Sequence, residues 1–133
     1  ILQECGYFDE SMKKYGGEDT DLSVRIWDIY PKSFVFSKKS DAVHHHRRDI
    51  NEFCNSMYTY GKYNLPLLVE KHPHYKQRFA TDWIFTIKGK LLFNLALKHL
   101  VHIIIKIYPF QIFIRYIVAD AVIRGARSSK LIN

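Results

Sequence analysis

The chain has 133 residues, which is enough for one domain. Apolar residues make up 47% of it, so the composition excludes an intrinsically disordered protein. There are 20 Lys and Arg against 13 Asp and Glu, a net charge of +7, and the two cysteines are too few for a disulfide-rich scaffold or a four-cysteine zinc module.

The excess positive charge lies in the second half of the chain. Residues 1–71 contain ten Lys or Arg and eleven Asp or Glu, a balance of −1, whereas residues 72–133 contain ten basic and two acidic residues, a balance of +8. The basic half is also the more apolar half, which favours contact with an anionic membrane surface. A solvated basic face over a helical core is the alternative, and nucleic acid is disfavoured because the basic residues alternate with Ile and Leu. No segment has the roughly 20 apolar residues of a spanning helix.

The first half is predicted to combine loops, one helix and short strands. Residues 1–17 read as a loop with a short helical turn that ends at a double glycine. A helix is predicted to begin near Asp19, where acids suit the helix dipole, and to end at Pro31. Residues 33–37 and 41–46 are predicted to be extended, the first because it is rich in β-forming residues.

The second half is predicted to be helical. A helix is expected over residues 49–70, weakened by Gly61 and Pro66. One long helix is predicted over residues 83–107, and a last one over residues 110–126. In the long helix the polar residues recur at every fourth position, and nearly all others are Leu, Ile, Val, Phe or Ala; the polar set is Asn94, Lys98, His102 and Lys106. So wide an apolar face must be covered by other helices or by lipid.

A pair of carboxylates follows the double glycine: Gly16 and Gly17 precede Glu18 and Asp19. Two glycines allow the backbone to approach a ligand closely. Adjacent carboxylates can accept hydrogen bonds from sugar hydroxyls, and one of them can act as a general base. The alternative interpretation is a glycine turn followed by an acidic helix cap.

Three consecutive histidines, His44, His45 and His46, precede Arg47 and Arg48. On an extended backbone the first and third imidazoles share a face, so one of the three can bind a divalent metal, while the arginines can approach phosphate oxygens. The alternative is a solvated polar loop. The remaining histidines are scattered, and we interpret them as structural: His72, His74, His99 and His102.

Four phrases carry a family resemblance by their order and spacing. Residues 5–10 (CGYFDE) resemble a GGFDE phrase with Tyr7 in place of the second glycine, and residues 15–19 (YGGED) resemble a (W/F/Y)GGED phrase. Residues 21–25 (DLSVR) resemble D-L-x-x-R, and residues 41–46 (DAVHHH) resemble DA-V-x-H-H. Together they resemble the C-terminal part of the catalytic domain of family 2 inverting glycosyltransferases, which have the GT-A fold.

The resemblance implies an α/β fold. Residues 1–48 would form the acceptor-side part of a GT-A (nucleotide-diphospho-sugar transferase) domain with short strands, truncated at its N-terminus, and residues 49–133 an α-helical tail associated with the membrane surface. The implied activity is metal-assisted, inverting transfer of a sugar from a nucleotide-sugar donor to a carbohydrate or lipid-linked acceptor, at the cytoplasmic, inner face of the membrane. Since the nucleotide-binding half of such a fold precedes the first phrase, we expect this chain to be inactive alone. The alternative is a non-enzymatic, membrane-associated helical adaptor.

The resemblance also implies a role for each candidate residue. Asp19 would be the general base that removes the proton of the acceptor hydroxyl, and Glu18 would bind the acceptor sugar beside Gly16 and Gly17. A histidine among His44, His45 and His46 would help hold Mg²⁺ or Mn²⁺. Arg47 or Arg48 would approach the diphosphate of the donor.

Overall fold

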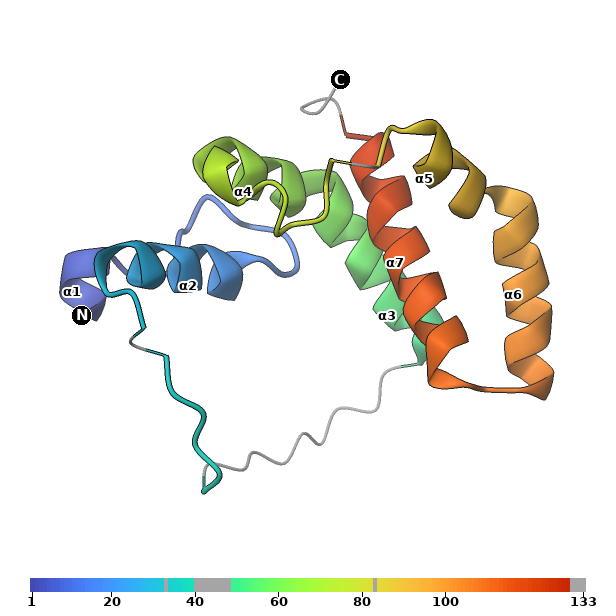
Figure 1. The fold of residues 1–133 in the computed structure, drawn as a ribbon, viewed down its shortest axis with the longest axis horizontal. Helices are drawn as coiled ribbons and strands as arrows, with labels where there is room; N and C mark the ends of the chain where they lie inside the picture. The colour runs from blue at the N-terminus through green and yellow to red at the C-terminus, as the bar shows by residue number, and fades with distance from the viewer. Residues whose placement is uncertain (33, 40–48, 83, 130–133) are drawn as a thin grey trace.

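The computed structural model describes residues 1–32, 34–39, 49–82 and 84–129, and its regular structure is helical (Figure 1). In chain order the elements are α1 (Leu2–Cys5), α2 (Glu18–Ile29), α3 (Ile50–Thr59), the π-helical turn η1 (Tyr60–Asn64), α4 (Leu65–Lys71), the short 3₁₀ turn η2 (Pro73–Tyr75), α5 (Ile87–Leu92), α6 (Leu95–Ile107) and α7 (Gln111–Arg127). No strand occurs within the described ranges. The prediction of an α/β fold with short strands, the C-terminal portion of a GT-A domain, is therefore wrong for this part of the chain.

The predicted strand over residues 33–37 shows why. Residues 34–37 have no regular structure, and Val35 and Phe36 are 87% and 89% exposed. A β-rich composition produces a strand only where a neighbouring strand pairs with its backbone and a face becomes buried. No strand among the described residues pairs with this segment, and of its apolar side chains only Phe34 has an aromatic neighbour, the ring of Trp27. The second predicted extended segment, residues 41–46, lies outside the described residues.

Helix α2 confirms the helix predicted from Asp19 to Pro31. Gly16 and Gly17 have φ angles of 78° and 102°, in the left-handed region where an L side chain is strained. This turn delivers the chain into α2 with Glu18 as its first residue, and the helix ends at Ile29, shortly before the proline. The acids of its first turn lie where the helix dipole favours negative charge.

The helix predicted over residues 49–70 is formed as α3, η1 and α4 in direct succession. The carboxylate of Asp49 caps its start by accepting from the backbone N–H of Asn51. Gly61 lies in the π-helical turn, and Pro66 lies in the first turn of α4, where a missing N–H is tolerated. The two predicted weak points thus produce a change of helix type and no break.

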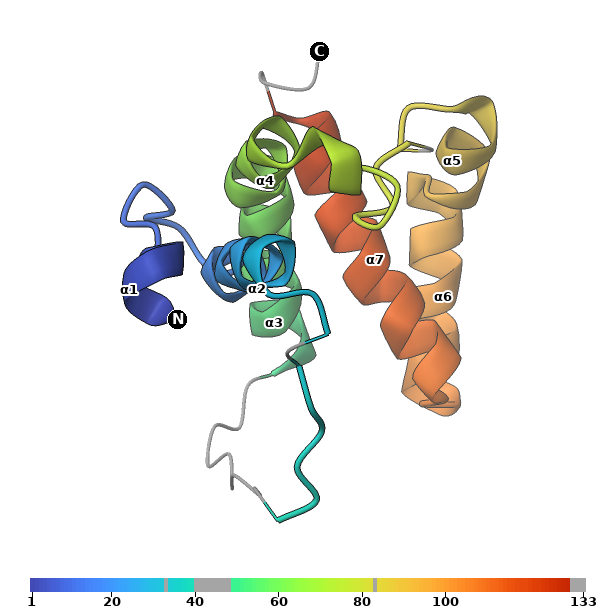
Figure 2. The same ribbon diagram turned by 60° about the vertical axis from the view of Figure 1, so that its left-hand side comes forward.

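The centre of the molecule is the crossing of α3 and η1 with α7, which Figure 2 shows from the side. A Cβ at Gly61 would collide with the backbone of Val122, and a Cβ at Gly125 would collide with the backbone of Tyr58. The two glycines therefore permit direct backbone contact between the helices. Around this crossing lies the buried apolar cluster of Leu65, Ile84, Phe93, Ile123 and Ala126.

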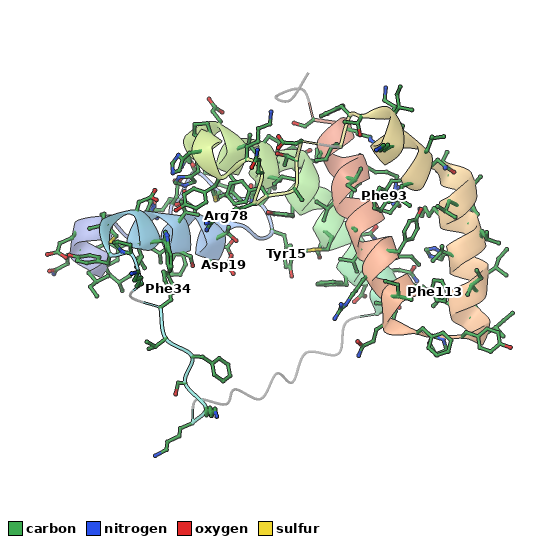
Figure 3. All side chains as sticks on the ribbon, in the orientation of Figure 1. Tyr15, Asp19, Phe34, Arg78, Phe93 and Phe113 are labelled. Carbon is green, nitrogen blue, oxygen red and sulfur yellow. The ribbon has the colours of Figure 1, made fainter. Side chains whose placement is uncertain are left out.

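The single helix predicted over residues 83–107 is wrong, because α5 ends at Leu92 and α6 begins at Leu95. The side chain of Asn94 accepts from the backbone N–H of Leu97 at 2.9 Å, so it caps a new helix. Phe93, labelled in Figure 3, turns inward at the break and is buried. Its ring stacks on that of Tyr116 of α7, with ring centroids 5.2 Å apart. The buried ring of Phe93 and the cap by Asn94 therefore stabilise the break, where the backbone hydrogen bonds of a continuous helix are absent.

Helix α6 exposes much of its apolar face. Leu100, Ile103 and Ile107 are 52%, 60% and 65% exposed, whereas Lys98 and His102 of the polar stripe line a cavity shared with α3 and α7. None of the described helices is both long and apolar enough to cross a bilayer. The wide apolar face predicted for this segment thus stays uncovered by the described residues.

Candidate functional site

The double-glycine turn is held in place by Asn64 of η1. Its side-chain amide donates to the backbone carbonyls of Lys14, at 2.8 Å, and Gly16. Asn64 is only 1% exposed, so these hydrogen bonds are made away from solvent. A Cβ at Gly17 would approach the ring of Tyr60 and the side chain of Leu68. The positive φ and the close packing therefore both favour glycine where the chain enters α2.

A pocket of about 300 Å³ opens at this turn, with Glu18 and Asp19 on one side and Met57 and Tyr60 on the other. Figure 3 shows Tyr15 and Asp19 near one another at the start of α2. Asp19 is exposed, and its Oδ1 accepts a hydrogen bond from the backbone N–H of Thr20 at 2.7 Å. The carboxylate is oriented by its own helix turn and remains open to a ligand in the pocket.

Glu18 and Tyr60 give the pocket its polar chemistry. The Oε2 atom of Glu18 is buried and has no hydrogen-bond partner among the described residues. Burial, and next the negative charge of Asp19, raise the pKa of Tyr60 to about 12. The phenol therefore stays protonated at neutral pH and can donate a hydrogen bond. The pocket combines carboxylate acceptors with one buried donor, a set that suits ligand hydroxyl groups.

Behind this pocket, Arg25 connects two of the phrases recognised in the sequence. Its guanidinium donates to the backbone carbonyls of Cys5, Gly6 and Tyr7, the last at 2.7 Å, and its Nε donates to Asp21 Oδ2 at 2.9 Å. Residues 5–7 are thereby fixed against α2. The arginine that the D-L-x-x-R phrase contributes thus binds the CGY residues of the first phrase.

The buried carboxylate of Asp21 has a second partner that the sequence interpretation missed. Its Oδ1 lies 2.9 Å from Nε2 of His72, and the two side chains are 2% and 8% exposed. His72 was interpreted as a scattered structural histidine, and the structure confirms a structural contact but also gives it a specific acidic partner. Only the contact between α2 and the end of α4 reveals the pair, since 51 residues separate them.

Besides the pocket at the start of α2, an aromatic groove of about 480 Å³ lies along the same helix. Thr20 lines both, and the groove is walled by Trp27, Phe34, Tyr75 and Phe79, with Arg78 at its edge. Trp27 and Phe34 stack with ring centroids 5.9 Å apart and are 36% and 50% exposed. Figure 3 labels Phe34 and Arg78 beside the helix. This groove was not anticipated, because its aromatic residues come from segments far apart in the sequence.

The predicted site residues divide into two groups. Gly16, Gly17, Glu18 and Asp19 line one pocket, as the glycine–carboxylate phrase indicates. The histidines 44–46 and the arginines 47–48 lie outside the described residues, so the metal role of the histidines and the diphosphate role of the arginines stay predictions. Among the described residues no three His, Cys, Asp or Glu side chains converge to hold a metal ion.

Comparison of the chain with protein-family models, with curated proteins and with solved structures finds no match. Any function is therefore proposed from the geometry of the pocket and from the phrases of the sequence.

Proposed function

We propose that this chain provides the acceptor-binding side of an inverting glycosyltransferase, with Asp19 as the general base. The observation that carries the proposal is the pocket at the start of α2, where the open carboxylate of Asp19 lies beside the half-buried Glu18 and the protonated Tyr60. The proposal concerns this acceptor chemistry and no longer includes an α/β fold. It agrees with the resemblance of residues 5–10 and 15–25 to glycosyltransferase phrases, which Arg25 binds to one another.

A carbohydrate acceptor fits the pocket and the aromatic groove, which share Thr20 in their linings. The unpartnered Oε2 of Glu18 can accept from a sugar hydroxyl, which would relieve the cost of a buried unpaired oxygen. The faces of Trp27 and Phe34 carry the negative charge of their π-systems, which attracts the polarised C–H groups of a sugar ring. An oligosaccharide bound along α2 would then present its terminal hydroxyl to Asp19.

In the proposed reaction, Asp19 removes the proton of that hydroxyl as the oxygen attacks the anomeric carbon of the donor. The bond to the nucleoside diphosphate breaks on the opposite side, so the configuration inverts. General base catalysis of this kind contributes about 10²–10⁴-fold. The nucleotide-sugar donor, and the roles of Arg47 and Arg48 toward its diphosphate, are proposed from the resemblance alone.

The implied Mg²⁺ or Mn²⁺ does not fit the described residues, which bring no metal-binding group together. Glu18 and Asp19 are one adjacent pair, and Asp21 is already bound by Arg25 and His72. The proposed ligands remain His44, His45 and His46, outside the described residues. We therefore derive no catalytic step through the metal.

We further propose that the protein works at the inner, cytoplasmic face of a membrane, held peripherally by α5 and α6. Ile87, Leu91 and Ile103 are 79%, 69% and 60% exposed, and residues 84–129 contain a single acid, Asp120, which is fully buried. The surface of this region is therefore apolar and cationic, which is complementary to anionic lipid. The same observation would favour the alternative of a non-enzymatic membrane adaptor, if the α2 pocket binds no carbohydrate.

Acceptor binding tests the proposal directly, because the role proposed for the pocket is to bind the acceptor. A panel of neutral and acidic oligosaccharides is titrated against the labelled chain, and backbone and side-chain chemical shifts are followed by NMR. At least one carbohydrate should shift Glu18, Asp19 and Trp27 together, and Glu18→Gln should weaken its binding. Glu52→Gln, at an exposed position of α3 that lines neither the pocket nor the groove, is the matched control and should bind normally. If no carbohydrate shifts these residues in the folded chain, the acceptor role is wrong.

A further inference from the structure

A second polar cavity lies on the opposite side of the molecule from the α1–α2 region, among α3, α6 and α7, which stand side by side in Figure 1. Its volume is about 320 Å³. Helix α6 contributes Lys98 and His102, α7 contributes Arg124, and α3 contributes Asn51 and Asn55. Three basic side chains from two helices therefore face one cavity, together with two amides from a third.

The orientation of α6 is the unusual feature of this cavity. Two residues of its polar stripe, Lys98 and His102, line the cavity, while Val101 is buried and Leu95, Leu100, Ile103 and Ile107 are exposed. In an ordinary surface helix the polar residues face solvent and the apolar ones are covered. Lys98 has no ion-pair or hydrogen-bond partner among the described residues, and Nδ1 of His102 is buried there without a partner. Polar groups that leave bulk water without a partner cost free energy. A bound anionic ligand would provide these side chains with the hydrogen-bond and ion-pair partners that the described residues do not.

The two charged side chains that line the cavity, Lys98 and Arg124, are both cationic. Asp120 is fully buried, and its Oδ2 accepts from Nε of Arg124 at 2.7 Å, so one carboxylate offsets one of two fixed positive charges. The positive charge of Lys98 is then left without a carboxylate partner among the described residues. Burial raises the pKa of Cys54 in the cavity wall; Lys98 and Arg124 lower it, and Asp120 and Asp49 raise it further, so two cations and two carboxylates act on the same thiol.

We propose that this cavity binds a phosphate group. Arg124 has two Nη groups besides the Nε that bonds Asp120, and the guanidinium fork matches the spacing of phosphate oxygens. Lys98 supplies a mobile point charge from the facing helix, and the amides of Asn51 and Asn55 can donate from α3. The cavity is larger than one phosphate needs, so it takes a phosphate ester with a small organic part. The inference does not depend on the proposed glycosyl transfer.

The ester can come from a soluble metabolite or from the headgroup of a lipid, since the exposed face of α6 lies next to the cavity. The full chain is titrated with inorganic phosphate, with glycerol 3-phosphate and with short-chain phosphatidic acid as monomers, and followed by NMR. We expect saturable shifts of the Asn51 and Asn55 side-chain amides and of His102. Tighter binding of phosphatidic acid identifies a lipid headgroup as the source, and tighter binding of glycerol 3-phosphate identifies a soluble ester. If none of the three compounds gives saturable shifts at these residues, the proposal is overturned.

Two variants distinguish specific binding in the cavity from non-specific electrostatic attraction of anions to the basic surface. Lys98→Gln should weaken binding of the ester by about tenfold or more, because a charge-assisted hydrogen bond is lost. Lys106→Gln removes the same charge two helical turns further along the stripe, at an exposed position that does not line the cavity, and should leave the affinity within about twofold. Circular dichroism confirms that both variants are folded. An equal loss in the two variants would mean a diffuse electrostatic effect, and the cavity would not be the binding site.

Discussion

Asp21 is bound on both of its carboxylate oxygens: Oδ1 lies 2.9 Å from Nε2 of His72, and Oδ2 accepts from Nε of Arg25 at 2.9 Å. Because Arg25 also holds the carbonyls of residues 5–7, this one buried carboxylate connects the N-terminal segment, α2 and the end of α4. The candidate pocket lies at the start of the same helix. Its geometry therefore depends on a network that does not itself contact the ligand.

The first prediction concerns this network. Asp21→Asn should lower the free energy of unfolding by about 3 kcal/mol, since it removes the shared charge and leaves two polar partners near a buried amide. Urea denaturation measures the change, and the backbone amides of residues 5–8 should exchange faster with solvent. Asp28→Asn is the control: its carboxylate accepts from the hydroxyl of Tyr75 and pairs with His74, both at exposed positions, and the change should cost less than about 1 kcal/mol. Equal losses in the two variants would contradict the central role of Asp21.

The local features of this region could be predicted from the sequence, and the long-range ones could not. Asp19 and the double glycine mark the start of α2 because a positive-φ turn and acids at a helix N-terminus act over a few residues. The partnership of Asp21 with His72 depends on how α2 packs against α4. The strand expected at residues 33–37 failed for a related reason, since composition says nothing about whether a partner strand exists.

The sequence contains a local signal for the break between α5 and α6, but the continuous apolar pattern of residues 83–107 favoured a single helix. Asn94 was interpreted as one member of a polar stripe, although Asn is also among the best residues for the N-cap of a helix. The inward orientation of Lys98 and His102 had no such signal. A polar stripe on a mostly apolar helix predicts solvent on the polar side, and only the packing of α6 on α7 reverses that expectation.

The second prediction tests the close helix crossing. Gly125→Ala should lower the free energy of unfolding by more than about 2 kcal/mol, because the added Cβ would meet the backbone of Tyr58 and force α3 and α7 apart. Helix propensity alone predicts the opposite sign, a gain of about 1 kcal/mol for alanine over glycine. The sign measured by chemical denaturation therefore decides between the two effects. Ser23→Ala, at an exposed position of α2, provides a control expected to change stability by less than about 0.5 kcal/mol.

The third prediction follows from the raised pKa of Tyr60. The group loses its proton near pH 10 in the unfolded chain and near 12 in the folded one, so its contribution to stability is complete below pH 10. It is lost as the pH rises from 10 to 12, and the free energy of unfolding should fall by about 2–3 kcal/mol from this group alone. Tyr60→Phe should make the decline between these pH values shallower. The same decline in both proteins would contradict the assignment, and NMR titration of the phenol carbons identifies which tyrosine ionises last.

The last prediction concerns the exposed face of α5 and α6. In flotation with vesicles, the chain should bind membranes that contain phosphatidylglycerol more strongly than membranes of phosphatidylcholine alone, and added salt should reduce the difference. The double variant Ile103→Ser and Ile107→Ser should bind at least about tenfold more weakly, because each exposed isoleucine would contribute more than 1 kcal/mol on entering the lipid.

Lys88→Gln combined with Lys90→Gln should reduce the preference for anionic lipid, since each lysine near the surface contributes about 1 kcal/mol, and should leave the apolar contacts in place. The matched control is Lys76→Gln, whose ammonium pairs with Asp82 at 3.7 Å, and it should bind as the original chain does. Unchanged binding after loss of the two isoleucines would mean that another surface contacts the lipid. Residues 84–129 contain seven basic residues and expose no carboxylate, which the proposal explains by contact with anionic lipid. Equal binding to both vesicle types would contradict that explanation.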